Sequence, residues 1–156
     1  MPITEILKKN AELYGSEVSL VEVNPGADTK MTWREFALTQ ATGTNYRREI
    51  TWKEFNDTAS RFANLLIANG VTKGTKVAIL LMNCLEWLPV YFGILKAGCV
   101  AVPMNFRYSG DEIRYCLELA DVEVLIFGPE FITRMDGIAD DLPGVKMLFF
   151  VGKNGP

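Results

Sequence analysis

The chain contains no histidine, and this absence excludes several kinds of chemistry at once. Histidine is the usual general base and a common metal ligand near neutral pH, so Ser–His and Cys–His catalysis and histidine–metal sites are excluded. Cysteine is scarce as well: Cys84, Cys99 and Cys116 lie far apart and form no C-x-x-C pair. A zinc ribbon and a dithiol redox motif are therefore excluded. We expect three buried thiols in a reducing cytoplasm.

The chain also has no excess of basic charge and no plain targeting or membrane segment. Sixteen Lys and Arg residues stand against nineteen Asp and Glu, so a nucleic-acid partner is not expected. The N-terminal MPITEILKKN lacks the basic and apolar regions of a signal peptide. The most apolar stretch, residues 77–95, contains Glu86, Pro89 and Gly93. A buried strand followed by a helix explains this stretch better than a transmembrane segment does.

Apolar runs that alternate with helical patterns make up most of the sequence. Residues 4–14 predict a helix closed by Gly15, Val18–Val23 has strand character, and residues 27–49 are polar and poorly patterned. Beyond them we expect strands at 77–82, 99–104, 122–127 and 147–151, and helices between them, the last at 131–139. Continuous apolar strands that alternate with helices predict an α/β fold with a predominantly parallel sheet and helices on both faces. We expect one subdomain over 1–156, with a lead-in at 1–49 and an α/β core at 50–152.

Three helix starts share a capping signal. Thr51, Asn83 and Ser109 each precede a glutamate by three residues, which is the spacing of a capping box. Asn69-Gly70 should end the first of these helices in a left-handed cap. Pro89 in the second helix predicts a kink or a delayed start. The pentapeptide Thr32–Phe36 nearly repeats as Thr51–Phe55, so a helix start is expected at both copies, but one short duplication is not a solenoid repeat.

Residues 87–95 of the second helix are apolar on all sides. We therefore expect this helix to be buried within a larger domain or against a partner. In the chain alone it should cause self-association, because apolar patches of several hundred Å² are usually contact surfaces.

Candidate binding residues are those that follow the expected strands, because parallel sheets bind ligands beyond the carboxyl ends of their strands. They are Asn83, Asn105, Arg107, Gly128, Gly152 and Lys153. Each also has a structural interpretation: a helix cap or turn for asparagine, a turn for glycine, a surface ion pair for arginine. Neither Thr42-Gly43-Thr44 nor Gly70–Lys76 has the context of a phosphate loop. The residues alone therefore predict an α/β domain without a catalytic, cofactor-binding or metal-binding residue.

Several segments resemble a known family in residue type, order and spacing. Ile50-Thr-Trp-Lys-Glu-Phe55 resembles the first core motif of adenylation enzymes, Leu-Thr/Ser-Tyr-x-Glu-Leu. Leu95-Lys-Ala-Gly-Cys-Val-Ala-Val-Pro-Met-Asn105 resembles the second, Leu-Lys-Ala-Gly-x-x-x-Val-Pro-Leu-Asn, and Phe106–Ile113 resembles the helix start that follows it. The chain is thus similar to the N-terminal portion of the AMP-forming acyl-CoA synthetases, in the adenylate-forming superfamily.

The resemblance implies a parent enzyme that activates a carboxylic acid, expected to be a fatty acid, with MgATP to an acyl-adenylate and then transfers the acyl group to CoA. ATP, Mg²⁺ and CoA would be used by the parent, and the partners of this chain would be the remaining subdomains or a second copy. The phosphate loop and the adenine, magnesium and ribose motifs of the family are absent from this sequence, so we expect the span alone to bind none of them and to be inactive. The alternative is a truncated, non-catalytic α/β binding or interaction module.

Overall fold

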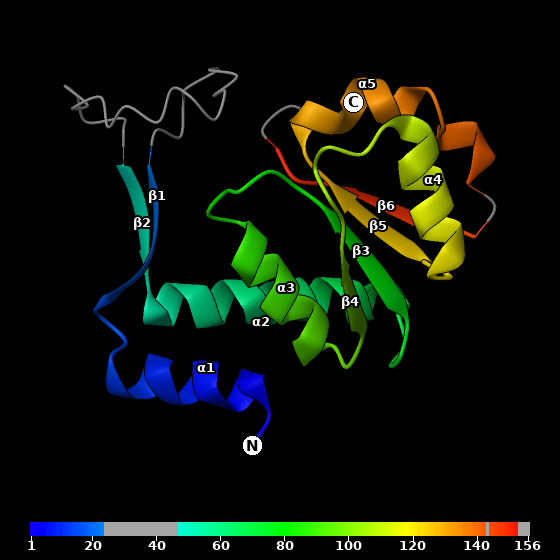
Figure 1. The fold of residues 1–156 in the computed structure, drawn as a ribbon. Coiled ribbons are helices and arrows are strands. Elements are labelled where there is room, and N and C mark those ends of the chain that lie inside the picture. The colour runs from blue at the N-terminus through cyan, green and yellow to red at the C-terminus, as the bar shows by residue number, and fades with distance from the viewer. Residues whose placement is uncertain (24–46, 143, 153–156) are drawn as a thin grey trace.

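The structure is a computed structural model that describes residues 1–23, 47–142 and 144–152 (Figure 1). The strands are β1 (Val18–Val23), β2 (Arg47–Thr51), β3 (Lys76–Leu80), β4 (Val100–Pro103), β5 (Val124–Phe127) and β6 (Met147–Phe150). The helices are α1 (Ile3–Leu13), α2 (Trp52–Ala68), α3 (Trp87–Lys96), α4 (Gly110–Leu119) and α5 (Ile132–Asp136), with short 3-10 helices at η1 (Pro129–Phe131) and η2 (Ala139–Asp141).

Four of the strands form a parallel sheet in the order β4-β3-β5-β6. Val77 of β3 lies opposite Ala101 of β4 and Val124 of β5, and Val124 lies opposite Met147 of β6. Helices α2 and α3 lie on one side of this sheet and α4 and α5 on the other (Figure 1). The predicted α/β fold with a parallel sheet covered on both faces is therefore confirmed.

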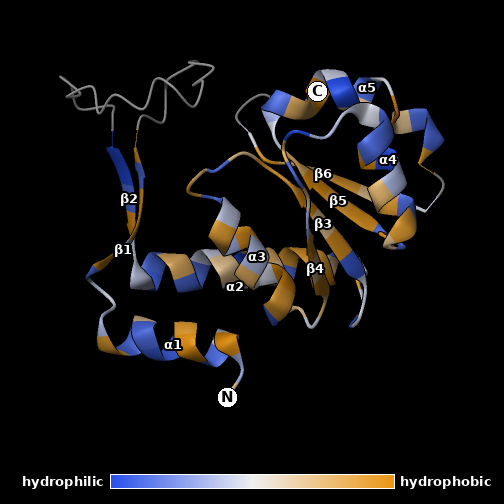
Figure 2. Ribbon diagram, viewed as in Figure 1, coloured by the Kyte–Doolittle hydropathy of each residue, from blue (hydrophilic) through white to orange (hydrophobic). Residues whose placement is uncertain are grey.

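Each face of the sheet has its own apolar cluster. Successive residues of a strand point to opposite faces, so Val77 and Ile79 of β3 pack with residues of α2 and α3, while Ala78 and Leu80 pack with residues of α4 and the segment after β5. Residues Val77–Leu80 are fully buried. Figure 2 shows the consequence: the strands of the parallel sheet are hydrophobic through the centre of the domain, whereas α4 and α5 carry hydrophilic residues.

Strand β2 was not predicted, and it pairs with β1 in a separate antiparallel ribbon. Its sequence, RREIT, has one apolar residue, because the ribbon buries only one face and the charged side chains can pair across it. Glu22 lies opposite Arg48, and their side chains form an ion pair of 3.0 Å. The expectation that residues 27–49 are poorly patterned is therefore wrong for residues 47–49, which belong to β2. The helix start expected at the pentapeptide copy, residues 32–36, lies outside the described residues.

Two of the three predicted capping boxes are present. The side chains of Thr51 and Ser109 accept hydrogen bonds from the backbone N–H of Glu54 and Glu112. The carboxylates of these two glutamates in turn accept hydrogen bonds from the backbone N–H of Thr51 and Ser109. Gly70, at the end of α2, has a φ of 81°, which confirms the predicted left-handed cap, and Gly98 at the end of α3 has a φ of 75°.

The third capping box, at Asn83, is wrong, because α3 begins only at Trp87. Pro89 therefore lies in the first turn, where its missing N–H has no intrahelical partner to lose, which confirms the delayed start. The Glu86 carboxylate accepts a hydrogen bond of 2.6 Å from Arg48 instead of returning to Asn83. The predicted helix 131–139 is also shorter than expected: α5 ends at Asp136, before Gly137, a poor helix former.

Helix α3 is only partly enclosed by this chain. Val90 and Ile94 are buried against the sheet, and Phe92 meets the ring of Phe55 edge to face at 5.2 Å. Trp87, Tyr91 and Leu95 are half-buried, so burial on all sides is not reached within the described residues. No helix of the described part of the chain is long and apolar enough to cross a membrane.

Candidate functional site

The candidate residues gather at one edge of the parallel sheet. The segments after β3, β4, β5 and β6 leave the sheet at the carboxyl ends of these strands, which lie on the same side in a parallel sheet. They carry Asn83, Asn105, Gly128 and Gly152, with Arg107 two residues after Asn105. The remaining candidate, Lys153, lies outside the described residues. The predicted placement at the carboxyl ends of the strands is confirmed for the described residues, and local contacts show the surroundings of Asn105, Gly128 and Asn83.

Asn105 forms the turn that leads from β4 to α4. Its side-chain Oδ1 accepts a hydrogen bond of 3.0 Å from the backbone N–H of Arg107, and its carbonyl oxygen accepts one of 3.1 Å from Tyr108. The guanidinium of Arg107 lies over the ring of Phe106, 5.5 Å from its centre. This arrangement matches the turn interpretation of Asn105.

Arg134 of α5 fixes the same turn, and sequence reasoning missed it. Its Nη1 donates hydrogen bonds of 2.8 Å to the carbonyl oxygen of Phe106 and 3.1 Å to that of Tyr108. Its guanidinium also stacks over the ring of Phe131 at 5.3 Å. The loop after β4 is thereby tied to the segment after β5. A single arginine in a short helix gives no sequence signal for such a contact.

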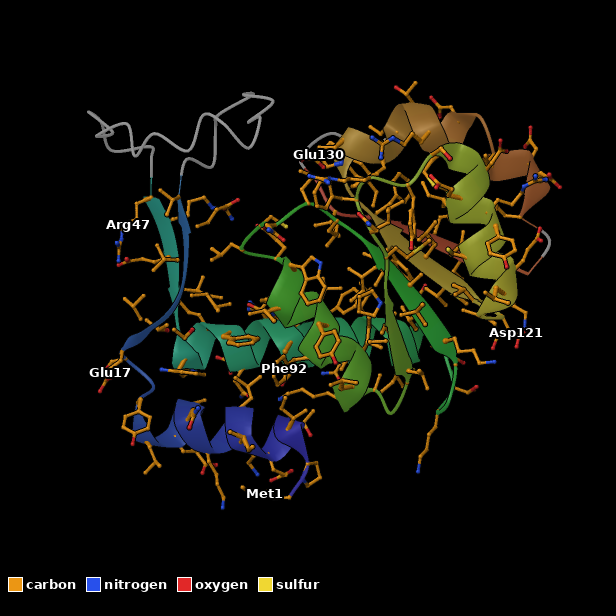
Figure 3. All side chains as sticks on the ribbon, in the orientation of Figure 1. Met1, Glu17, Arg47, Phe92, Asp121 and Glu130 are labelled. Atoms are coloured by element: carbon orange, nitrogen blue, oxygen red, sulfur yellow. The ribbon has the colours of Figure 1, made fainter. Side chains whose placement is uncertain are left out.

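Gly128 permits a close approach between the ends of β5 and β3. Its N–H donates to the carbonyl oxygen of Leu80 at 3.2 Å. A Cβ at this position would lie 3.2 Å from Leu81 Cδ2 and 2.9 Å from Glu130 Oε2. A side chain here would require the flexible carboxylate of Glu130 to move and Leu81 to shift by a few tenths of an ångström, so the glycine makes this close approach easier. Glu130 projects at this end of the sheet in Figure 3.

Asn83 lines a groove of about 380 Å³ between β1 and the segment that precedes α3. The other lining residues are Leu20, Val21, Glu22, Val23, Cys84, Leu85, Trp87 and Leu88. Burial, together with the negative charge of the nearby Glu86 carboxylate, raises the pKa of the Cys84 thiol to about 11. The thiol is therefore protonated at neutral pH and is not a nucleophile.

Two ion pairs that share Arg48 lie beside this groove. Arg48 of β2 contacts Glu22 at 3.0 Å and Glu86 at 2.6 Å. Partial burial tends to raise the pKa of Glu86, but the hydrogen bond and the positive charge of Arg48 outweigh it, so the pKa lies below its ordinary value. The chain of charges connects the ribbon to the segment before α3.

A second groove, of about 370 Å³, opens at the amino ends of the strands. Four of its charged residues form two ion pairs: Lys76 with Asp121 at 3.0 Å and Lys146 with Glu123 at 2.6 Å. Parallel sheets bind ligands beyond the carboxyl ends of their strands. We therefore interpret these pairs at the amino ends as ordinary surface ion pairs. Figure 3 shows Asp121 on the outside of the molecule.

The described residues contain no group of three Cys, His, Asp or Glu that could hold a metal ion. Among these same residues every buried side-chain nitrogen or oxygen has a hydrogen-bond partner. The polar groups at the carboxyl ends of the strands thus stabilise turns and connect one loop to another. Among the described residues, they do not place a nucleophile beside a base.

Comparisons with known proteins agree on one family. The model of the AMP-binding enzyme family matches residues 8–150. A medium/long-chain-fatty-acid–CoA/3-oxocholest-4-en-26-oate–CoA ligase of Mycobacterium marinum is 32% identical over 103 residues, which are 66% of this chain and 19% of that protein. A crotonobetaine/carnitine–CoA ligase of Citrobacter koseri is 30% identical over 110 residues, 70% of this chain and 21% of that protein.

A solved structure gives the same result for the fold. The N-terminal domain of FACL13 from Mycobacterium tuberculosis superposes with a TM-score of 0.77 and 25% identity, over 97% of this chain and 34% of that one. The chain therefore spans about a fifth of the length of the curated relatives it matches and about a third of this solved domain.

Proposed function

The chain belongs to the AMP-binding enzyme family, and from this membership we propose that it is the N-terminal scaffold of an AMP-forming acyl-CoA synthetase. The parent enzyme would join a carboxylic acid, a fatty acid first of all, to AMP from ATP with release of pyrophosphate. The CoA thiolate would then displace AMP. The observation that carries the proposal is the match of nearly the whole chain to the N-terminal domain of a relative.

The second motif that resembles adenylation enzymes contacts the helix that the first motif begins. The first motif caps α2 at Thr51, and Asn56 and Ser60 lie on that helix. The second motif ends α3 with Lys96, whose Nζ donates hydrogen bonds of 2.7 Å to Asn56 Oδ1 and 3.0 Å to Ser60 Oγ. Burial lowers the pKa of Lys96. Lys96 of the second motif thus joins α3 to α2, and this contact supports a scaffold role.

We propose that this span supplies no catalytic residue and binds no ATP, Mg²⁺ or CoA by itself. Its described residues do not fit these groups: no acidic cluster suits a metal ion, and no glycine-rich loop follows a strand. We further propose that residues 1–156 are one subdomain with a lead-in and an α/β core. The cytoplasm is the proposed location, in keeping with three free cysteines.

The test is a chimera of the Mycobacterium marinum ligase in which residues 8–150 of this chain replace the matching segment. We expect fatty-acid-dependent formation of AMP and acyl-CoA by the chimera, and no ATP–pyrophosphate exchange by the chain 1–156 alone. A folded but inactive chimera would contradict the scaffold role and favour the non-catalytic interaction module. Exchange catalysed by the purified chain, and abolished by a substitution within it, would contradict the absence of catalytic residues.

A further inference from the structure

The pair Asn69-Gly70 follows Ala68, the last residue of α2, in the segment that leads to β3 (Figure 1). Both residues are exposed to solvent. A Cβ built on Gly70 would meet nothing within 4 Å apart from its chain neighbours, so the space beside this peptide bond is open. An asparagine that precedes glycine cyclises readily, because glycine has no side chain to hinder an attack by its backbone nitrogen. The pair is therefore accessible to water and suited to this reaction.

The reaction needs only water and hydroxide besides the chain itself. Hydroxide removes the proton of the Gly70 backbone N–H, and the nitrogen attacks the side-chain Cγ of Asn69. The bond between Cγ and Nδ2 breaks, and Nδ2 takes up protons from water and leaves as ammonia. Water then opens the succinimide ring at one of its two carbonyl carbons. Opening at the backbone carbonyl carbon gives isoaspartate, in which the main chain runs through Cβ and Cγ.

Two hydrogen bonds restrain the reacting groups in the folded chain. Asn69 Nδ2 donates to the carbonyl oxygen of Leu65 at 2.8 Å, which holds the side chain back along α2. The backbone N–H of Gly70 donates to the carbonyl oxygen of Ile67 at 3.0 Å, so its proton is not free for removal. Both bonds must break before the ring can close. The reaction therefore requires the last turn of α2 to open.

Buried side chains stabilise this turn. The backbone N–H of Val71 donates to the carbonyl oxygen of Leu66 at 3.0 Å. Leu66 is fully buried and Val71 is 7% exposed, and both belong to the apolar cluster on the α2–α3 face of the sheet. The side chain of the adjacent Leu65, in contrast, is 45% exposed. Opening of the turn should therefore depend on the side chain of Leu66 and much less on that of Leu65.

We propose that Asn69 is a self-modification site, at which the chain converts asparagine to isoaspartate at a rate limited by the opening of the last turn of α2. This inference is independent of the proposed function. The product destabilises the turn in two ways. It places a negative charge at the C-terminal end of a helix, where the helix dipole is already negative. The lengthened main chain also displaces Val71 from the position in which it is buried.

Peptide mapping of the chain after incubation in a mildly alkaline buffer tests the site. Trypsin releases residues 62–73 as one peptide, which keeps this site apart from the second Asn-Gly pair of the sequence, at 154–155. We expect isoaspartate at Asn69 and none at Asn64, which lies within α2 and precedes a leucine. Equal conversion of Asn64 and Asn69 would contradict the assignment.

The rate shows whether opening of the turn is limiting. The folded chain should convert about 10-fold or more slowly than the free peptide 62–73, because only the open turn reacts. This slowing should match the protection of the Val71 amide against hydrogen exchange to within about 3-fold. Conversion as fast as in the peptide overturns the proposal. So does slowing far beyond that protection, because opening of the turn then does not limit the reaction.

Two neighbouring leucines provide matched substitutions. Leu66→Ala should speed the conversion of Asn69 about 10-fold or more, because it removes a buried side chain from the last turn of α2. Leu65→Ala should change the rate by less than about 2-fold, because that side chain is largely in solvent. Equal effects would contradict the proposal. If Leu66→Ala does not fold, Val71→Ala takes its place, with the same expected direction and the same control.

Asn69→Asp separates the two effects of the product, because it adds the charge without lengthening the main chain. We expect Asn69→Asp to raise the equilibrium constant of unfolding about 3-fold. The purified isoaspartate form should raise it about 10-fold or more, because Val71 is also displaced. Chemical denaturation of both forms measures the difference. An isoaspartate form as stable as the starting chain would contradict the proposed effect on the turn.

Discussion

The two sheets of this molecule are stabilised in different ways. In the parallel sheet, residues Val124–Phe127 of β5 are buried on both faces between helices. In the ribbon, β1 alternates between exposed and half-buried residues and pairs with β2 through Glu22 and Arg48. Only Leu20 and Ile50 of the ribbon pack against a small cluster formed by α1 and α2. The parallel sheet therefore depends on apolar burial, whereas the ribbon depends on the helices that it adjoins.

The largest expected effect is in the parallel sheet. Leu125 of β5 is fully buried, and Leu125→Ala removes its side chain from the cluster between the sheet, α4 and the segment after β5. We expect a loss of about 2–5 kcal/mol in the free energy of unfolding, measured by chemical denaturation. Val23→Ala in the ribbon is the control, because Val23 is 61% exposed and its loss should change stability by less than about 0.5 kcal/mol. Similar losses for both variants would contradict the difference between the sheets.

Leu7 tests how the ribbon and α1 depend on each other. Leu7 is buried on α1 and contacts the cluster that contains Phe55 and Ala59 of α2. We expect Leu7→Ala to cost about 2 kcal/mol in the docking of α1, at the low end for a buried leucine because the cluster is small. Hydrogen exchange should become faster in α1 and β1 while the amides of β3 and β5 keep their protection. Equal loss of protection in both sheets would show that they unfold as one unit.

The same contrast explains which elements could be predicted from the sequence. The strands of the parallel sheet are continuous apolar runs, and this pattern directly indicates strands buried on both faces. Strand β2 was missed because RREIT needs only Ile50 to face the cluster, and its other side chains are satisfied by charge pairing. The capping signal succeeded at Thr51 and Ser109, where no other group competes for the glutamate. It failed at Asn83, because Arg48, 38 positions away in sequence, binds Glu86.

The candidate site also has features that the sequence predicts and contacts that it does not. Topology places residues that follow parallel strands at one edge, so the common location of Asn83, Asn105 and Gly128 could be predicted from the strand pattern. The contacts of Arg134 with the loop after β4 join segments 26 and 28 positions apart, and no local pattern encodes them. The contact of Lys96 with Asn56 is also long-range, at 40 positions, although both ends lie in or beside a recognisable motif.

A smaller effect is expected at the helix starts, where the ribbon meets α2. Thr51 is both the last residue of β2 and the cap of α2, so Thr51→Ala should cost about 1 kcal/mol in the free energy of unfolding. Asn83→Ala is the matched comparison, because the cap position of α3 is Glu86 and no side chain caps that helix. We expect Asn83→Ala to change stability by less than about 0.5 kcal/mol. Thermal denaturation of both variants measures the difference, and an equal loss would show that Asn83 stabilises α3 after all.

The smallest effect concerns the ion pair that connects the ribbon to the segment before α3. The pKa of Glu86 is lowered in the folded chain, so its ionised form stabilises the fold at pH values above the unfolded pKa, and this contribution disappears as the pH falls through the folded pKa. Glu86→Gln should therefore reduce stability at pH 7 and leave it unchanged near pH 2. The difference should be below about 1 kcal/mol, because both side chains are more than a third exposed. Denaturation of Glu86→Gln across this pH range, with and without Arg48→Met, measures the pair. The glutamine substitution should have no pH-dependent effect once Arg48 is absent. If the effect persists without Arg48, the ion pair is not its source, and the ribbon is held to the rest of the chain by packing alone.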